Sequence, residues 1–339
     1  MKKLIVIVLG VALIVGLSYM ALNLKSNSKA TDISLIAFAV EDTSTVNKIE
    51  IYDSYTDQNF SVSRNDEGIW VGENGECIQQ NIIQMMLETM NKITLKGYVP
   101  QSAMANMKKR LMANHKTVKI YQNGKWAKTW YVGHSTQDHM GTHMLLETPD
   151  IKSDNPVIMG MKGFYGILEP RFFADARRFA CIGLFSYKSS DLKQVEVINR
   201  VVPDKSYLIE INSPDDISVT TNGKPVQNIN KDNLTFYLNG FENVNFNQPN
   251  FTLSPAQIDS IKASTPDYEL NITAKQSSYN LDLYRRLDPE YDKKDTLAYD
   301  QDYLWGVKSD GDLVRVQYYS VGPLIQGKTV FVNEFITIE

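Results

Sequence analysis

The stretch Val46-Asn-Lys-Ile-Glu-Ile-Tyr52 returns later in the chain as Leu192-Lys-Gln-Val-Glu-Val-Ile198. Both stretches alternate apolar and polar residues with a period of two, which predicts a β-strand with one buried face. The copies lie 146 residues apart at Ile49 and Val195 (195 − 49). Because the same series of patterns follows each copy, the sequence predicts an internal duplication.

Each copy is followed by two further short strands, a helix, an extended piece and a second helix. Apolar residues from Gln80 to Ile93 recur at three- and four-residue steps, which predicts a helix, and its counterpart runs from Asp232 to Val244. The second helices are predicted from Ser102 to Ala113 and from Ser254 to Ala263. In both, the first serine is a candidate N-cap, because its hydroxyl can accept from the free amides of the first turn.

A hairpin closes each copy. In the first copy it turns at Asn123-Gly124, a strong hairpin signal because both residues tolerate positive φ. The offset at this end is 152 residues, from Ile120 to Ile272 (272 − 120), so loop lengths account for the drift. The alternative is that an ordinary α+β chain shows this order by chance, but order, spacing and closing hairpin agree.

Length and composition limit the classes of protein to which the chain can belong. The chain has 339 residues, 43% of them hydrophobic and 22% charged. These fractions are typical of globular proteins, and the length is sufficient for two domains. The net charge of −4 argues against a nucleic-acid-binding protein, which needs clustered basic residues on one face. We read the short clusters Lys108-Lys109-Arg110 and Arg285-Arg286 as solvated edges.

The N-terminus predicts a membrane anchor. Lys2-Lys3 is followed by Leu4 to Leu24, which contains no charge and is long enough to cross a hydrocarbon core of roughly 30 Å. We expect an uncleaved single-pass anchor, although Ser28-Lys29-Ala30 leaves a cleaved signal peptide open. The lysines then stay in the cytoplasm, and the rest of the chain is expected on the extracytoplasmic side of the membrane.

Cys77 and Cys181 are the two cysteines of the chain, 104 residues apart (181 − 77). An oxidising compartment would allow them to pair, but the sequence does not set their distance. Two separate buried thiols are the expectation.

Three of the four histidines lie together at His134, His139 and His143, beside Asp138. These residue types can bind zinc, but the run that follows reads as a strand, on which His139 and His143 lie about 13 Å apart. We therefore expect no metal site, with these histidines as the weak alternative. A second alternative is a hydrolase that uses His134, Asp138 and a serine of the region between the copies. No Gly-x-Ser-x-Gly motif supports that alternative.

Downstream, Arg171, Arg177 and Arg178 are interleaved with aromatic residues. Guanidinium groups stack on rings and bind carboxylates, so this segment is a candidate site for an anionic ligand or a peptide. The alternative is a linker packed on both lobes, in which Arg171 forms an ion pair with Glu169 or Asp175.

The chain resembles the membrane-anchored bacterial proteins grouped as domain of unknown function 4340. The resemblance rests on four features: the Lys-Lys anchor, the repeated Ile-Glu-Ile and Val-Glu-Val starts, the pattern Thr136-x-Asp138-x-x-Gly141-Thr142-x-Met144, and Pro170-Arg171-Phe172-Phe173. It spans most of the chain and carries over no catalytic residue. It implies a single-pass protein of the bacterial inner membrane with its body in the periplasm. Some members look like accessory parts of ABC-type export or gliding-motility systems, which implies contacts with other envelope proteins. With the three arginines, Thr136, Asp138 and Thr142 are the candidate ligand-binding residues.

Near the C-terminus, Asp300, Asp302, Asp310 and Asp312 lack the terminal glutamate of a calcium loop, so we expect no calcium site. Asp310-Gly311 predicts a hairpin turn, and Thr329 to Val332 a last strand.

The sequence thus predicts an α+β protein of two similar lobes, each a mainly antiparallel sheet with two helices, after one transmembrane helix. The predicted parts are residues 1–30 for the anchor and linker, 31–187 for the first lobe and 188–339 for the second. We expect a binding or scaffolding protein that contacts the membrane through residues 4–24 and other envelope proteins through its body. No cofactor, enzymatic activity or nucleic-acid partner is expected.

Overall fold

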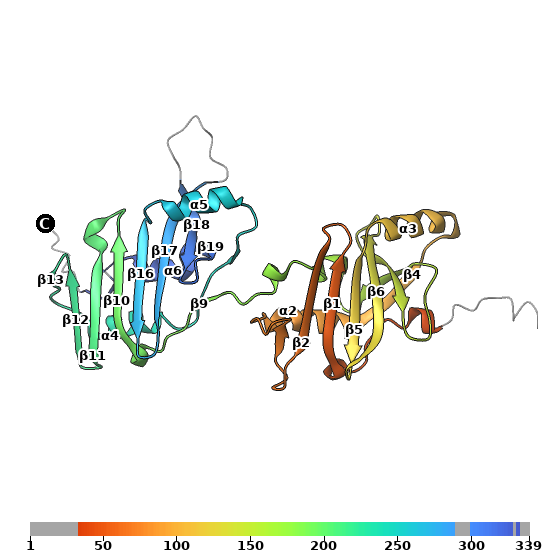
Figure 1. Cartoon of the computed structure of the whole chain (residues 1–339), viewed down its shortest axis with the longest axis horizontal. Coiled ribbons are helices and arrows are strands. Elements are labelled where there is room, and N and C mark those ends of the chain that lie inside the picture. Colours follow the sequence, from red (N-terminus) through yellow and green to blue (C-terminus); the bar gives the residue numbers. More distant parts are fainter. Residues whose placement is uncertain (1–32, 289–298, 328–329, 333–339) are drawn as a thin grey trace, which may run out of the picture. The chain divides into compact units, whose positions relative to one another are not determined.

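The computed structural model describes residues 33–288, 299–327 and 330–332. The chain divides into two compact units between Ala180 and Cys181. Both units consist of antiparallel sheets with helices packed on them, so the predicted α+β class is confirmed (Figure 1). The apolar run from Leu4 to Leu24 lies outside the described residues. Within them, no helix has the length and apolar character needed to cross a membrane.

The first unit contains an eight-stranded sheet in the order β3-β2-β1-β5-β6-β7-β8-β4. Its elements are β1 (Val46–Asp53), β2 (Gln58–Arg64), β3 (Trp70–Gly72), α2 (Gln80–Lys92), β4 (Ile93–Tyr98), α3 (Gln101–Ala113), β5 (Lys116–Gln122), β6 (Lys125–Ser135), β7 (Thr142–Glu147) and β8 (Val157–Met161).

One face of this sheet is buried under α2. The alternation predicted for β1 places Ile49 and Ile51 in the core, where both are almost fully buried. The apolar stripe of α2 packs against the same core through Ile83, Met86 and Met90, among others. The helix predicted from Gln80 to Ile93 is therefore confirmed, ending one residue earlier.

The other helix, α3, lies against the opposite face, over β6. Val132 of β6 is in the core, so the next residue, Gly133, faces the other way. A Cβ at Gly133 would lie 3.0 Å from a methyl carbon of Leu111 in α3, so a larger residue here would require Leu111 to shift. The predicted cap at Ser102 is wrong. Because α3 begins at Gln101, its N-cap is Pro100, and Pro100 makes no side-chain capping bond.

The second unit contains a nine-stranded sheet in the order β13-β12-β11-β10-β16-β17-β18-β19-β15, and the small pair β14-β9. Its elements are β9 (Gly183–Phe185), β10 (Leu192–Asn199), β11 (Tyr207–Ser213), β12 (Asp216–Thr221), β13 (Lys224–Pro225), α4 (Lys231–Asn239), β14 (Val244–Asn245), β15 (Gln248–Pro249), α5 (Pro255–Ala263), β16 (Tyr268–Ala274), β17 (Ser278–Leu287), β18 (Tyr299–Lys308), β19 (Leu313–Gln317) and α6 (Tyr318–Ile325).

Helices α4 and α6 share one core with the inward residues of this sheet, including Val195 and Val197. Helix α5 packs elsewhere, against a smaller cluster built on Tyr284, Trp305 and Leu313. Ser254 caps α5, as predicted, and the structure adds a full capping box with Gln257.

Helix α4 is shorter than predicted, because it ends at Asn239 instead of Val244. Gly240 follows it in a turn, and Asn243 has a φ of +62°, which no helix accommodates. The predicted last strand is also wrong. The described residues of that stretch, 330–332, form only a single bridge, from Val332 to Ile229.

The central strands of the two units pair in the same way. Ile49 lies opposite Ile120 and Val62, and Val195 lies opposite Ile272 and Ile209. Each central strand also shifts register near its start, between Val46 and Lys48 in the first unit and between Leu192 and Gln194 in the second. These pairings keep the offsets of 146 and 152 residues found in the sequence.

The expectation of two separate thiols is wrong, since Cys77 and Cys181 are both disulfide-bonded. Their neighbours explain how residues so far apart in the sequence meet. Ile78 pairs with Ala180 in an isolated antiparallel bridge, and the backbone amide of Gln79 donates to the carbonyl of Phe179 at 2.8 Å. Tertiary pairing between the residues that follow Cys77 and those that precede Cys181 thus brings the two cysteines together.

Candidate functional site

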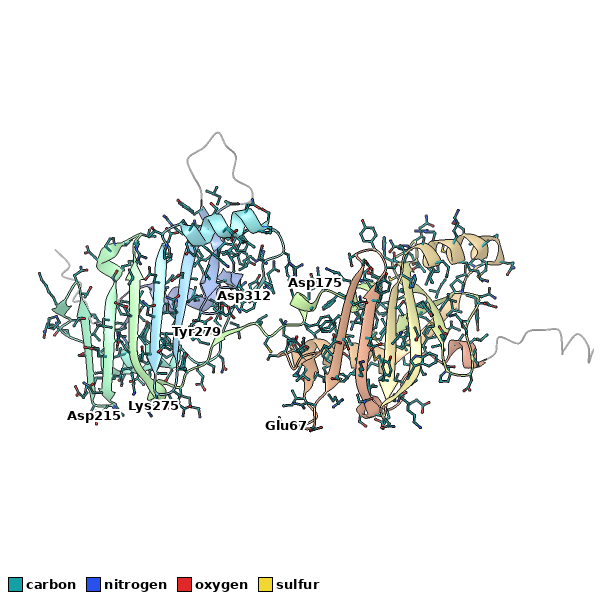
Figure 2. All side chains as sticks on the ribbon, in the orientation of Figure 1. Glu67, Asp175, Asp215, Lys275, Tyr279 and Asp312 are labelled. Carbon is teal, nitrogen blue, oxygen red and sulfur yellow. The ribbon has the colours of Figure 1, made fainter. Side chains whose placement is uncertain are left out.

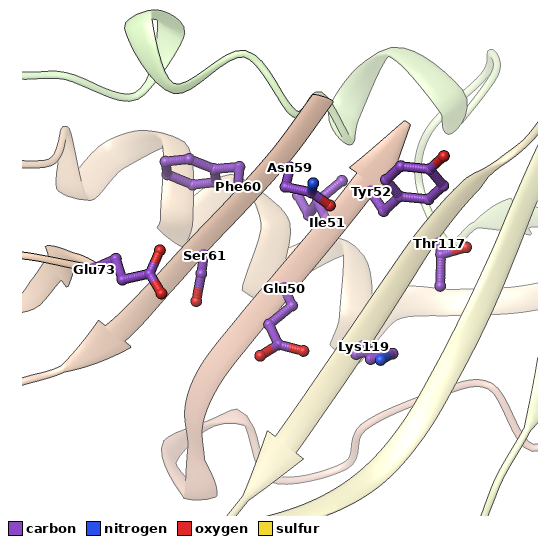
Figure 3. Close-up of a pocket in the computed structure, with 9 residues that line it drawn as sticks. All are labelled: Glu50, Ile51, Tyr52, Asn59, Phe60, Ser61, Glu73, Thr117 and Lys119. Atoms are coloured by element: carbon purple, nitrogen blue, oxygen red, sulfur yellow. The ribbon is translucent and has the colours of Figure 1, made fainter. Parts of the chain in front are cut away.

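The first unit carries a polar hollow on the sheet face that α2 does not cover. It has a volume of about 260 Å³, and its lining includes residues of β1, β2 and β5 (Figure 3). Alternation explains these side chains. Because Ile49, Ile51 and Val118 point into the core, the residues between them point to the opposite face. The lining residues are Glu50, Ile51, Tyr52, Asn59, Phe60, Ser61, Glu73, Thr117 and Lys119.

Glu50 is at the centre of this hollow, opposite Ser61 on one side and Lys119 on the other. The ammonium of Lys48 lies 2.6 Å from its carboxylate, and the hydroxyl of Tyr121 donates to it at 2.9 Å. Burial raises the pKa of the Glu50 carboxyl, but the hydrogen bonds from Lys48 and Tyr121 outweigh burial and leave the pKa below its ordinary value. The carboxylate is therefore ionised at neutral pH.

Charges of alternating sign continue across the sheet. Lys119 lies opposite Thr129, and Thr129 lies opposite Glu147, so one strand separates the lysine from the second glutamate. Glu147 accepts hydrogen bonds from Tyr131 and from Lys152, the latter at 3.0 Å. Lys119 itself is exposed and has no ion pair within the described part of the chain. We call Lys48, Glu50, Lys119, Glu147 and Lys152 the charged row.

The charged row is suited to binding. It offers ammonium donors and carboxylate acceptors on a rigid sheet, where a polar partner can pair with both. A nucleophilic mechanism needs a hydroxyl that donates to a base. Across the residues that the structure describes, neither Ser61 nor Thr117 makes such a bond to Glu50 or Glu73.

A second hollow of about 270 Å³ contains His134. It lies where β1 and β6 end and β5 begins, and it is lined by Asp53, Tyr55, Asn114, His115, Lys116, Val132, Gly133, His134 and Glu169. Lys116 and Glu169 form an ion pair in it. The ring Nδ1 of His115 is bound to the carbonyl oxygen of Leu111 at 2.9 Å.

The residues of the hydrolase alternative, His134, Asp138 and a serine, do not come together in this hollow. Asp138 is not among its lining residues, and neither is any serine. Asp138 instead accepts from the Thr136 hydroxyl at 2.5 Å and from the Met140 amide at 3.0 Å, within the turn between β6 and β7.

The histidine cluster is also divided. The ring Nδ1 of His143 lies 3.1 Å from the backbone oxygen of His134, and His139 has a φ of +56° in the turn. Within the described ranges, no group of three histidine, cysteine, aspartate or glutamate side chains is placed to hold a metal ion.

Thr142 and Arg171 of the predicted ligand-binding set have internal partners. Thr142 is fully buried, and its hydroxyl accepts from the amide of Leu168 at 2.8 Å. Arg171 donates to the hydroxyl of Thr89 at 3.2 Å, and its guanidinium lies 4.4 Å from the ring centroid of Phe164.

Arg177 and Arg178 lie in a short turn and also have partners. Arg177 is paired with Asp175 at 2.7 Å, which keeps the pKa of that carboxyl below its ordinary value. The guanidinium of Arg178 lies 5.5 Å from the ring centroid of Phe173. The ion pair that the alternative predicted for Arg171 is not observed, since Asp175 pairs with Arg177 and Glu169 pairs with Lys116 in the described part of the chain.

Sequence reasoning missed Glu50 and Lys119. The signal was present in the alternation of Lys48, Glu50 and Tyr52, which identified the strand but was not read as a polar surface. Comparison of the chain with protein-family models, with curated proteins and with solved structures finds no match.

Proposed function

We propose that this protein is a membrane-anchored extracytoplasmic binding or scaffolding protein, built from a duplicated α+β unit. The observation that carries the proposal is the disulfide of Cys77 and Cys181, because disulfides persist in oxidising compartments and are rare in the cytosol. The charge-free run from Leu4 to Leu24 after Lys2-Lys3 supports the same orientation.

Matching registers support the duplication. A chance similarity of composition would not give the two central strands equivalent neighbours and the same register shift. Each unit also has an equivalent bond near its first helix. The amide of Val40 donates to the carbonyl of Met90 in α2 at 2.8 Å, and the amide of Tyr187 donates to the carbonyl of Phe241, just beyond the end of α4, at 2.9 Å.

The charged row is the proposed binding surface of the first unit. Its partners are other envelope proteins, and the resemblance noted above implies components of ABC-type export or gliding-motility systems. A hydrolase has less support, because His134, Asp138 and a serine do not line one hollow.

A labelling experiment tests the location of the body. The variant Cys77→Ser leaves Cys181 as the one thiol of the full chain. In bacteria with a permeabilised outer membrane, a membrane-impermeant maleimide should label this variant in intact cells, and the wild-type chain only after reduction. Labelling that requires cell lysis, or reduced cysteines in the wild type, would contradict the proposal.

Cross-linking on intact membranes, followed by capture of the full chain, tests the binding surface. The double variant Glu50→Gln with Lys119→Gln removes both central charges of the row. Glu196→Gln is the matched control, because Glu196 occupies the position of Glu50 in the second unit. We expect an envelope protein to be recovered with the wild type and the control but not with the double variant. Recovery that is equal in all three would exclude the charged row as the surface.

A further inference from the structure

The second unit has a larger hollow than either one described above. It lies beside the ends of β10 and β11 and has a volume of about 880 Å³. The two strands pair from Val197, opposite Tyr207, to Gln194, opposite Glu210. Since β10 begins at Leu192, its first two residues have no partner in β11. We call the space beside these unpaired ends the β10–β11 hollow. Figure 2 labels Lys275 of its rim at this end of the sheet.

The first unit fills the corresponding place with two large side chains. Arg64 lies two residues beyond Val62 in β2, and Trp70 lies opposite Arg64. The Nε of Arg64 donates to the carbonyl of Val46 at 2.9 Å and so connects the ends of β1 and β2. Its guanidinium lies 5.0 Å from the ring centroid of Trp70, which is only 5% exposed.

The second unit has isoleucines at both positions. Ile211 lies two residues beyond Ile209 in β11, and Ile217 lies opposite Ile211. An isoleucine side chain is smaller than tryptophan and donates no hydrogen bond, so neither residue can reproduce the plug that Arg64 and Trp70 form.

The lining of the β10–β11 hollow fits a small ligand with an apolar body. Its apolar residues are Leu192 and Leu238, which are buried, Ile211 and Ile217, which are partly buried against the core, and Pro214. Small-molecule sites in proteins are mostly apolar, have volumes of roughly 300–1,000 Å³ and carry a few polar groups for orientation.

The charges at the rim favour an anion. Lys193 and Lys275 line the hollow, and Glu210 is the one carboxylate residue among its lining. Lys193 is exposed and has no ion pair within the part of the chain that is described. Lys275 lies 3.4 Å from Asp191, with both side chains about half exposed, so this pair is weak.

We propose that the β10–β11 hollow binds a small amphipathic anion, with its apolar body against Leu192, Ile211 and Ile217 and its charged group near Lys193 and Lys275. The site rests on the proposed function only in treating the chain as a binding protein. It requires no envelope partner. Failure of the binding test below would therefore leave the labelling test of the body's location unaffected.

Photolabelling of the full chain in lipid nanodiscs tests this site, with dodecanoate that carries a diazirine as the probe and mass spectrometry to locate the label. We expect label on peptides of residues 189–194, 211–217 or 235–238. The variant Ile211→Arg with Ile217→Trp installs the plug of the first unit and should reduce this label by roughly tenfold, equivalent to about 1.4 kcal/mol. Arg64→Ile with Trp70→Ile is the matched control and should leave it unchanged.

A charge variant keeps the test decisive if the plug variant fails to fold. Lys193→Glu with Lys275→Glu changes exposed side chains and should weaken labelling by the anion, but not by the neutral diazirine dodecanol. Label that is scattered over both units, or that survives the plug in a folded variant, overturns the site. Equal labelling by the two probes would contradict the preference of the site for an anion.

Discussion

Removal of the disulfide should destabilise the first unit. The perturbation is Cys77→Ser with Cys181→Ser, which leaves the neighbouring bonds in place. The amide of Gln79 still reaches the carbonyl of Phe179, at 2.8 Å in the native chain, and its side chain still donates to the carbonyl of Ala180, at 3.0 Å. The native geometry is thus held without the sulfur atoms, and the main effect falls on the unfolded chain.

The magnitude follows from the length of the loop that the disulfide closes. Cys77 and Cys181 are 104 residues apart (181 − 77). In the chain-entropy account, a loop of this length restricts the unfolded state by about 4.7 kcal/mol at 25 °C. With a urea dependence near 2 kcal/mol per molar, the midpoint of unfolding should fall by on the order of 2 M.

Hydrogen exchange in increasing urea, followed by mass spectrometry, measures this change separately for peptides of each unit in the intact chain. Tryptophan fluorescence supplies a second readout that is weighted toward the first unit, which contains Trp70, Trp126 and Trp130, while Trp305 is in the second. A loss below roughly 1 kcal/mol in the first unit would refute the loop-closure reasoning, as would an equal loss in the second unit.

Three further predictions concern substitutions with defined outcomes. Glu50→Gln should cost about 0.5 kcal/mol at pH 7, because the carboxylate is paired with Lys48 at the surface. Pairing lowers the pKa of Glu50, so its contribution to stability is present above the unfolded carboxyl pKa and is lost as the pH falls through the lower, folded pKa. Urea unfolding of the variant and of the wild type should therefore converge at acid pH, and a difference that stays constant with pH would contradict this. Trp130→Ala should cost about 3–5 kcal/mol in thermal or urea unfolding, because Trp130 is fully buried between Phe38 and Phe172, and a cost under 1 kcal/mol would mean that the core collapses around the gap. Ser254→Ala should cost about 1 kcal/mol and raise exchange at the first turn of α5, whereas Ser102→Ala should have no such effect on α3, because Ser102 is not its cap.

The candidate site was only partly predictable. The segment from His134 to Phe179 has the residue types of a binding site, yet Thr142 and Arg171 bind Leu168 and Thr89 within the protein. Whether a polar side chain meets a ligand or its own chain depends on what packs beside it, and residues such as Thr89 lie far away in the sequence. Glu50 and Lys119 are ordinary strand residues until β1 and β5 pair and place them side by side.

The sequence by itself determined the local elements, because alternation and three- to four-residue periodicity depend only on near neighbours. It placed the central strands, the first helix, the Asn123-Gly124 turn with its φ values of +51° and +77°, and the Ser254 cap. Only the tertiary structure decided that Cys77 meets Cys181 and that Arg64 with Trp70 fills one strand end while Ile211 with Ile217 leaves its counterpart open. These outcomes depend on contacts between distant residues, and no local pattern specifies them.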